Sequence, residues 1–145
     1  MVEKEGVAAL SVREAARRAG VSHNAPYRHF RDRDALLTAL AAEGMAKLLK
    51  ELGERSGREL AEAYVRFALS RPQLFRLMFT GQRWPELETR FTQAFAQVGK
   101  PGAAAAWGLV HGLAFLLLDG HFPAEEREPF AARVLGALRF AQRSA

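Results

Sequence analysis

Apolar residues recur along the chain at the three- and four-residue spacing of amphipathic helices, and no stretch alternates as a strand would. The clearest stripe, rich in leucine, runs from Leu36 to Leu52 and stops at Gly53, a residue suited to ending a helix. Asp32 precedes this stripe and can cap the first turn of the helix. The pattern predicts an all-α fold with one long helix in its first half.

Helical spacing of apolar residues continues in the second half of the chain, where glycine and proline interrupt it at loop-length intervals. Pro72 is expected to begin a short helix, and the run GKPG at residues 99–102 is expected to break the chain. Helices are predicted over residues 58–71, 72–79, 87–98, 103–118 and 130–140. A boundary near Gly53 divides a helical head, residues 1–52, from a larger helical body, residues 53–145.

The head has the plan of a helix-turn-helix. Ser11 and Glu14 form a capping box at the start of one helix, and Gly20 can end that helix in a left-handed conformation. Ser22 can cap a second helix almost at once, in which Pro26 is tolerated because it lies in the first turn. The two short helices are therefore joined by a turn of about three residues, as in DNA-binding helix-turn-helix motifs.

Positive charge is concentrated in the same segment. The chain has a net charge of +5, and residues 11–33 hold six arginines against two acidic residues, which leaves +4 there. Such a segment favours a polyanionic partner. The partner predicted for the head is double-stranded DNA.

The residue types of the second short helix suit the edges of bases. Asn24 can bond adenine in a bidentate manner, His23 can donate or accept at a base edge, and the Pro26 ring can contact a thymine methyl group. Other side chains of the segment can reach phosphates. The capped N-termini of the two short helices also present backbone N–H groups to anions. The predicted DNA-binding residues are Ser11, Arg13, Ser22, His23, Asn24, Pro26, Tyr27, His29 and Arg33.

Several side chains of the head could have a structural role instead of a DNA contact. Tyr27 suits a phosphate contact or a place in the core, and Phe30 is predicted to be a core residue. Arg17 and Arg18 are expected on a solvated helix face. Asn24, taken alone, could equally be a polar surface residue.

In the body, Gly108 and Gly112 lie four residues apart on one helical face, where the missing side chains let another helix approach closely. Together with the apolar last helix they predict a two-fold, four-helix dimer interface; the alternative is close packing within one subunit. The predicted interface residues are Gly108, Gly112, Phe115, Val134 and Leu138.

Trp107 and His111 share an adjacent face of the same helix by their spacing. Large apolar side chains elsewhere in the body can line a cavity with them, although such stripes also build ordinary cores, and His111 suits either a ligand contact or a structural hydrogen bond. The predicted effector pocket consists of Phe67, Leu74, Met78, Trp84, Phe91, Trp107 and His111.

Several classes of function are disfavoured. The chain has no cysteine and no hydrolase, zinc-protease, phosphate-loop or dinucleotide motif, so neither an enzyme nor a cofactor is predicted. His23 and His29 are six residues apart, which does not suit a shared metal on a helix. The apolar run at residues 103–118 is shorter than the roughly 18 to 20 residues of a membrane span. We expect a cytoplasmic protein with no membrane partner.

The segment SVREAARRAGVSHNAPYRHFRDRDALLTAL, residues 11–40, closely resembles the DNA-binding segment of TetR-family transcriptional regulators. The stretches YVRFALSRPQLFRLMF and AWGLVHGLAFLLLDG resemble the C-terminal domain of a TetR subgroup marked by Trp, His and Gly, here Trp107, His111 and Gly112. The resemblance implies DNA contacts at the head residues named above, and a body that dimerises and holds a small-molecule pocket. It implies a ligand-released repressor that binds a palindromic operator as a homodimer.

One departure from the TetR pattern concerns the first helix. Only MVEKEGVA precedes the ALS that opens the motif, so most of the first helix of the head is expected to be missing. Either the start lies upstream or the head has lost a packing partner. The alternative function is therefore a helical protein that binds a small molecule or a partner and has lost DNA binding through its shortened head.

Overall fold

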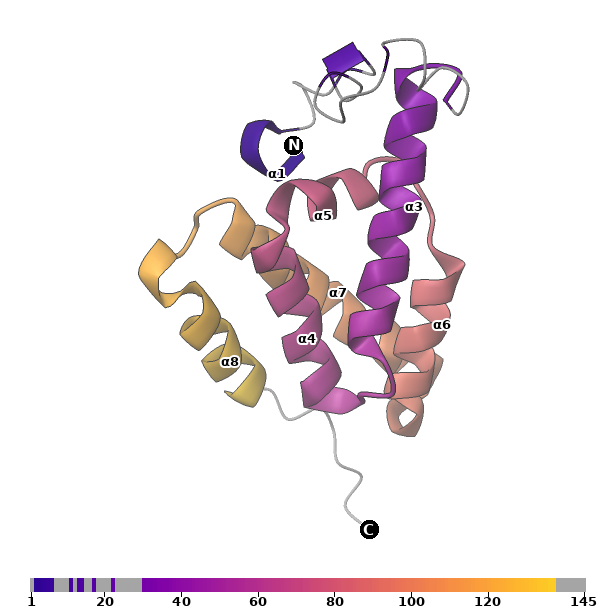
Figure 1. Cartoon of the computed structure of the whole chain (residues 1–145). Coiled ribbons are helices and arrows are strands. Elements are labelled where there is room, and N and C mark those ends of the chain that lie inside the picture. The colour runs from indigo at the N-terminus through magenta and orange to yellow at the C-terminus, as the bar shows by residue number, and fades with distance from the viewer. Residues whose placement is uncertain are drawn as a thin grey trace. The chain divides into compact units, whose positions relative to one another are not determined.

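The structure is a computed structural model that describes residues 2–6, 11, 13–14, 17, 22 and 30–137. Every regular element in these residues is helical and none is a strand, which confirms the predicted all-α class (Figure 1). The elements are α1 (Val2–Glu5), α3 (Arg33–Leu52), α4 (Gly57–Ser70), α5 (Pro72–Met78), α6 (Pro85–Ala94), η3 (Ala96–Val98), α7 (Gly99–Leu118), η4 (Ala124–Glu126) and α8 (Arg127–Ala137).

The long helix α3 has the bounds that the sequence predicts. The backbone N–H of Ala35 donates to Asp32 Oδ1 at 2.8 Å, which is the expected N-cap. At the other end Gly53 takes a positive φ of 47°, and its N–H donates to the carbonyl of Leu49 at 3.0 Å. Local capping therefore determines both ends of this helix.

The chain divides into two compact units. One holds Met1–Lys47 and Arg71–Gln82, and the other holds Leu48–Ser70 and Arg83–Ala145. The sequence placed a single boundary near Gly53 and assigned everything beyond it to the body. In the structure α5 groups with the N-terminal segments instead, because it packs against α1 and α3.

In the first unit, the start of α5 is held by a carboxylate from α1. The backbone N–H groups of Gln73 and Leu74 donate to Glu3 at 3.1 and 2.7 Å. These N–H groups lack partners inside their own helix, so an acidic side chain there satisfies them and complements the helix dipole. A contact between residues 70 positions apart thus fixes the place of a seven-residue helix.

Helix α5 also approaches α3 closely at one glycine. A Cβ atom added at Gly44 would lie 2.9 Å from Leu74 Cδ1 and from Met78 Sδ. The missing side chain is what allows these two apolar residues to pack on α3. Near the start of α3, Phe30 packs against Leu36, so the predicted core role of Phe30 is confirmed.

The second unit is built around α7, which packs against α4 and α6, while α8 packs against α4 (Figure 1). Its core contains fully buried aromatic side chains from α4 and α6, among them Tyr64, Phe67 and Phe91. Arg90 of α6 secures the turn before α4, because its guanidinium donates to the carbonyl oxygens of Gly53, at 2.7 Å, and Arg55.

The prediction that residues 99–102 break the chain is wrong in its placement. Helix α7 begins at Gly99 and includes this run in its first turn. Pro101 is tolerated there because the first-turn N–H groups have no partner within the helix. The change of chain direction falls at Gly99 itself, whose φ of 71° favours glycine.

Candidate functional site

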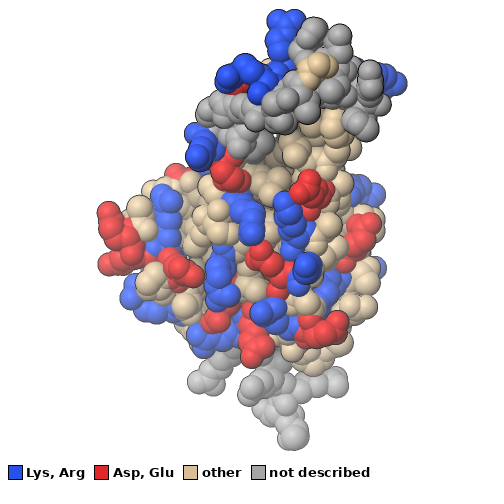
Figure 2. All heavy atoms as spheres, in the orientation of Figure 1, with Lys and Arg blue, Asp and Glu red and all other residues tan. Residues whose placement is uncertain are grey.

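Of the predicted DNA-binding residues, the structure describes Ser11, Arg13, Ser22 and Arg33, and all four are exposed. Lys and Arg side chains are prominent in this part of the chain, at the top of Figure 2. Positive charge at the surface attracts a polyanion. The other predicted contacts, His23, Asn24, Pro26, Tyr27 and His29, lie outside the described residues, as does Arg18.

The predicted N-cap of the first short helix is present. The backbone N–H of Glu14 donates to Ser11 Oγ at 3.0 Å. The Glu14 carboxylate accepts from Arg17 Nη2 and Nε at 2.6 and 2.9 Å. Arg17 is exposed, so its predicted place on a solvated face is confirmed.

The body contains a cluster of rings from three helices, which we call the aromatic cluster. The Phe91 ring stacks on Trp107 with centroids 5.6 Å apart, and on Phe95 at 6.1 Å. The edge of Tyr64 meets Phe91 at 5.4 Å, and the His111 ring lies 6.2 Å from Tyr64. The cluster consists of Tyr64 from α4, Phe91 from α6, Phe95, and Trp107, His111 and Phe115 from α7.

The hydroxyl group of Tyr64 is the polar centre of the aromatic cluster. Trp107 Nε1 donates to it at 3.4 Å, and it lies 2.8 Å from His111 Nδ1. An indole N–H can only donate, so the Tyr64 proton is available for His111 when the imidazole is neutral. Burial raises the pKa of Tyr64, an effect that the hydrogen bond from Trp107 partly opposes. Burial also lowers the pKa of His111, which favours the neutral imidazole.

The structure brings together only part of the predicted effector pocket. Phe91, Trp107 and His111 meet in the aromatic cluster. Leu74 and Met78 belong to the first unit, where they pack on α3. The remaining two predicted residues lie in the second unit: Phe67 is fully buried on α4, and Trp84 is half-buried at the N-cap of α6.

Sequence reasoning missed Tyr64, although a usable signal was present. A tyrosine on the apolar stripe of a helix brings a hydroxyl that requires a partner when buried. Its partners, Trp107 and His111, were already singled out on one face of a later helix. The structure adds that all three polar groups converge on one oxygen atom.

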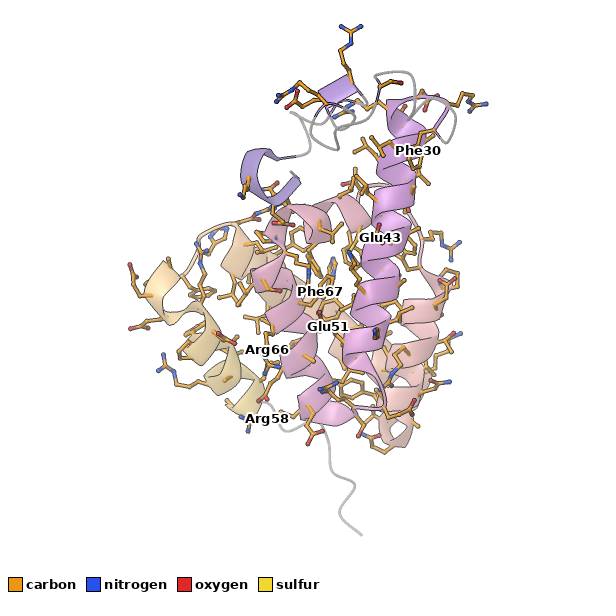
Figure 3. The ribbon with its side chains drawn as sticks, viewed as in Figure 1. Phe30, Glu43, Glu51, Arg58, Arg66 and Phe67 are labelled. Atoms are coloured by element: carbon orange, nitrogen blue, oxygen red, sulfur yellow. The ribbon has the colours of Figure 1, made fainter. Side chains whose placement is uncertain are left out.

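A groove of about 310 Å³ lies between α4 and α8 and is separate from these predicted residues. Apolar residues of both helices line the groove, and Arg66 of α4, labelled in Figure 3, is one of its polar residues. Arg66 Nε lies 3.5 Å from Glu128 Oε1 of α8. Both side chains are exposed, so this ion pair contributes little to stability. Among the residues that the structure describes, no group of three or more His, Asp or Glu is placed to hold a metal ion.

Helix α7 carries two apolar faces, one buried and one exposed. Gly108 and Gly112 lie on the exposed face, and a Cβ atom added at either would meet nothing within 4 Å. Leu109 and Leu116 on the same stripe are 40% and 45% exposed. Of the other predicted interface residues, Phe115 and Val134 are half-buried and Leu138 lies outside the described residues. The glycines therefore do not accommodate a helix of the same chain among the described residues.

By length and composition, residues 96–118 are apolar enough to cross a membrane, and 33% of the most apolar stretch is buried. A core helix of a soluble protein passes the same test. In this chain, the buried face of the helix packs against α4 and α6.

Because burial favours the neutral form of His111, we expect the free energy of unfolding to depend on pH. Its pKa is lowered by burial from the ordinary 6.5, so the unfolded chain takes up the proton first. The free energy of unfolding should therefore be fully maintained above about pH 6.5 and should fall as the pH drops below that value. Urea unfolding at a series of pH values measures this effect. His111→Gln does not titrate and retains an acceptor for Tyr64, so an identical pH profile in this variant would contradict the assignment.

Two models of known protein families match separate parts of the chain. The model described as "Bacterial regulatory proteins, tetR family" matches residues 1–40, and the model described as "Tetracyclin repressor-like, C-terminal domain" matches residues 58–138. A solved structure titled as a protein with unknown function from Rhodococcus sp. RHA1 is similar, with 34% identity and a TM-score of 0.63. That match covers 92% of this chain and 87% of the other. No curated protein matches the chain.

Proposed function

Because the chain belongs to the TetR family of DNA-binding transcriptional regulators, we propose that it is a homodimeric repressor that leaves its operator when a small molecule binds the body. The observation that carries this proposal is the pairing of the two family matches in one chain, residues 1–40 and 58–138. Both matches point to a regulator rather than an enzyme. We place it in the cytoplasm, where such a regulator meets its DNA.

We assign DNA binding to residues 1–52 and effector binding and dimerisation to residues 53–145. Exposed Arg13 and Arg33 support the first assignment, since cations near the helix-turn-helix can contact phosphates. In this proposal Asn24 and its neighbours read base edges. The match of the model described as "Tetracyclin repressor-like, C-terminal domain" to residues 58–138 supports the second assignment.

The exposed face of α7 supports a homodimer. Leu109 and Leu116 leave apolar surface uncovered, and Gly108 and Gly112 leave room for a helix to approach. The same face on a second copy would cover this surface around a two-fold axis. Two heads related by that axis would meet successive major grooves about 34–36 Å apart, so the operator should be roughly palindromic.

Selection of bound sites from random duplex DNA tests the proposal directly. We expect enrichment of a site with two related halves, and binding that weakens steeply as salt concentration rises. If the protein shows no preference among duplexes at moderate ionic strength, the regulator proposal is lost and the alternative of a helical ligand-binding protein remains.

Asn24→Ala should relax base preference at one position of each half-site. The loss of a bidentate contact costs about 1–3 kcal/mol of discrimination. Arg33→Gln is the contrasting variant, because loss of a phosphate contact should weaken all sequences alike and lower the salt slope by about one. An unchanged selected-site profile for Asn24→Ala would remove this residue from the proposed base contacts.

A further inference from the structure

The groove between α4 and α8 is formed by one stripe of side chains from each helix. On α4 the lining residues recur at three- and four-residue intervals from Glu62 to Leu69, and on α8 the same spacing recurs from Glu128 to Leu135. Residues at this spacing share one face of a helix. From Glu62 to Leu69 the helix rises about 10 Å, so the groove is long enough for an extended molecule.

Small side chains on α8 leave space in the groove. Ala131 and Ala132 form the middle of the α8 stripe, where larger side chains would reach toward α4. The volume of about 310 Å³ lies at the lower end of the range of ligand pockets. At roughly 30 Å³ for each water molecule, this space corresponds to about ten waters. The groove therefore suits an organic molecule with about the same number of non-hydrogen atoms.

The apolar lining favours an aliphatic molecule. Among the described residues that line the groove, none is aromatic. Val65, Ala131 and Leu135 are buried along it, each at no more than 4% exposure, and Leu69 is half-buried. Such side chains bind a ligand through the burial of apolar area alone. The additional gain of an aromatic ligand from stacking requires a ring in the lining.

The charged residues of the groove favour a positively charged group on the ligand. The lining includes two carboxylates, Glu62 and Glu128, and one guanidinium, Arg66, although the whole chain has a net charge of +5. The side chains of Arg66 and Glu128 are 61% and 71% exposed, so a competing cation displaces this ion pair at small cost. An anion beside Arg66 would be opposed by the two carboxylates.

The Glu62 carboxylate supplies the directional contact. Its side chain is 28% exposed, which is less than that of either other charged residue in the lining. Glu62 Oε1 accepts from Arg58 Nε at 2.6 Å, and Arg58 does not line the groove. A carboxylate has about four acceptor positions on its two oxygen atoms. Glu62 can therefore accept a hydrogen bond from a ligand ammonium group without releasing Arg58.

We infer that the groove between α4 and α8 is the effector site of the second unit, and that it takes a small aliphatic amine in its ammonium form, which Glu62 recognises. This inference rests on the proposed function, in which the body binds a small molecule. It adds the place of the site, the chemical class of the ligand and the residue that selects its charge.

Three compounds with the same apolar chain separate the elements of this inference. At neutral pH octylammonium is a cation, octanol is neutral and octanoate is an anion. Each compound is titrated into the whole protein, and binding is followed through the methyl resonances of Val65 and Leu135, which line the groove. The methyl resonances of Leu109 and Leu116, which are exposed on α7, report adsorption to a different apolar surface.

We expect octylammonium to bind about tenfold more tightly than octanol, as one charge-assisted hydrogen bond allows, and octanoate to bind more weakly than either. Glu62→Gln retains the shape and should reduce the tenfold ratio to about threefold, because a bond to a neutral acceptor is about half as strong. Glu86→Gln removes the same charge at an exposed position of α6 and should keep the tenfold ratio. Ala132→Leu fills the groove and should weaken all three compounds about tenfold, the effect of leaving roughly two CH₂ groups in water.

The inference is overturned if octylammonium leaves the Val65 and Leu135 resonances unchanged, or if it shifts those of Leu109 and Leu116 at equal or lower concentration. It is also overturned if octanol or octanoate binds the wild-type protein as tightly as octylammonium, or if the tenfold ratio survives in Glu62→Gln. The wild-type comparison is decisive even if a variant does not fold.

Site selection on DNA needs none of these compounds, so the proposed function and this inference fail separately. DNA preference without the expected binding pattern leaves the regulator and removes this site. The expected binding pattern without DNA preference removes the regulator and leaves a helical protein that binds an aliphatic amine.

Discussion

Replacing Leu116 with glutamate should convert the proposed homodimer to monomers and lower its affinity for a selected operator by about 100- to 10,000-fold. Leu116 is 45% exposed on the apolar face of α7, next to the open space at Gly112. A glutamate there would bury an unpaired charge in the proposed interface. The operator would then be held by one head at a time, without the gain in effective concentration that a joined second head provides. Sedimentation and DNA titration at fixed salt measure the two effects.

Thr89→Glu is the matched control for this change. It adds the same charge at an exposed position of α6, so the oligomeric state and DNA affinity should both stay close to wild type. If Leu116→Glu remains dimeric with unchanged operator affinity, the exposed face of α7 is not the interface. If it becomes monomeric and still binds the operator as tightly, the coupling between dimerisation and DNA binding is wrong.

Features governed by nearby residues could be predicted from the sequence. The bounds of α3 follow from Asp32 and Gly53, because capping acts within one helical turn. The Pro72 start of α5 and the end of α7 at Leu118 follow from similar local rules. The run at residues 99–102 misled because glycine and proline interrupt a helix interior and yet suit its first turn.

Contacts between distant residues could not be predicted. The grouping of Arg71–Gln82 with the first unit depends on Glu3 meeting Gln73 and Leu74. No periodicity encodes a pairing across 70 positions. Apolar spacing identifies Leu74 and Met78 as inward-facing and leaves open which unit they face.

The aromatic cluster also combines a feature that nearby residues determine with a contact between distant residues. Trp107 and His111 were predicted to share a face because they lie one helical turn apart, and both now reach Tyr64. Tyr64 itself lies 47 positions from His111, and only the packing of α4 on α7 brings them together. The sequence thus indicated the polar groups of α7 without indicating the oxygen atom that they share.

Phe91→Ala should lower the free energy of unfolding by about 3–5 kcal/mol, a large part of a typical total of about 5–15 kcal/mol. The Phe91 side chain is 1% exposed and contacts three rings of the aromatic cluster, so its removal leaves an apolar cavity as well as lost burial. Chemical denaturation at neutral pH measures the change. Gln93→Ala, on the exposed side of the same helix, should change stability by no more than about 0.5 kcal/mol.

Filling the cavity provides a second measure of the same packing. A cavity lined by apolar rings stays dry and accepts a small aromatic molecule, so benzene should raise the stability of Phe91→Ala more than that of the wild-type protein. Phe91→Leu retains most of the side-chain volume, so its free energy of unfolding should lie between those of Phe91→Ala and the wild-type protein. A loss below about 1 kcal/mol in Phe91→Ala, or no rescue by benzene, would mean that Phe91 of α6 does not hold the aromatic cluster together.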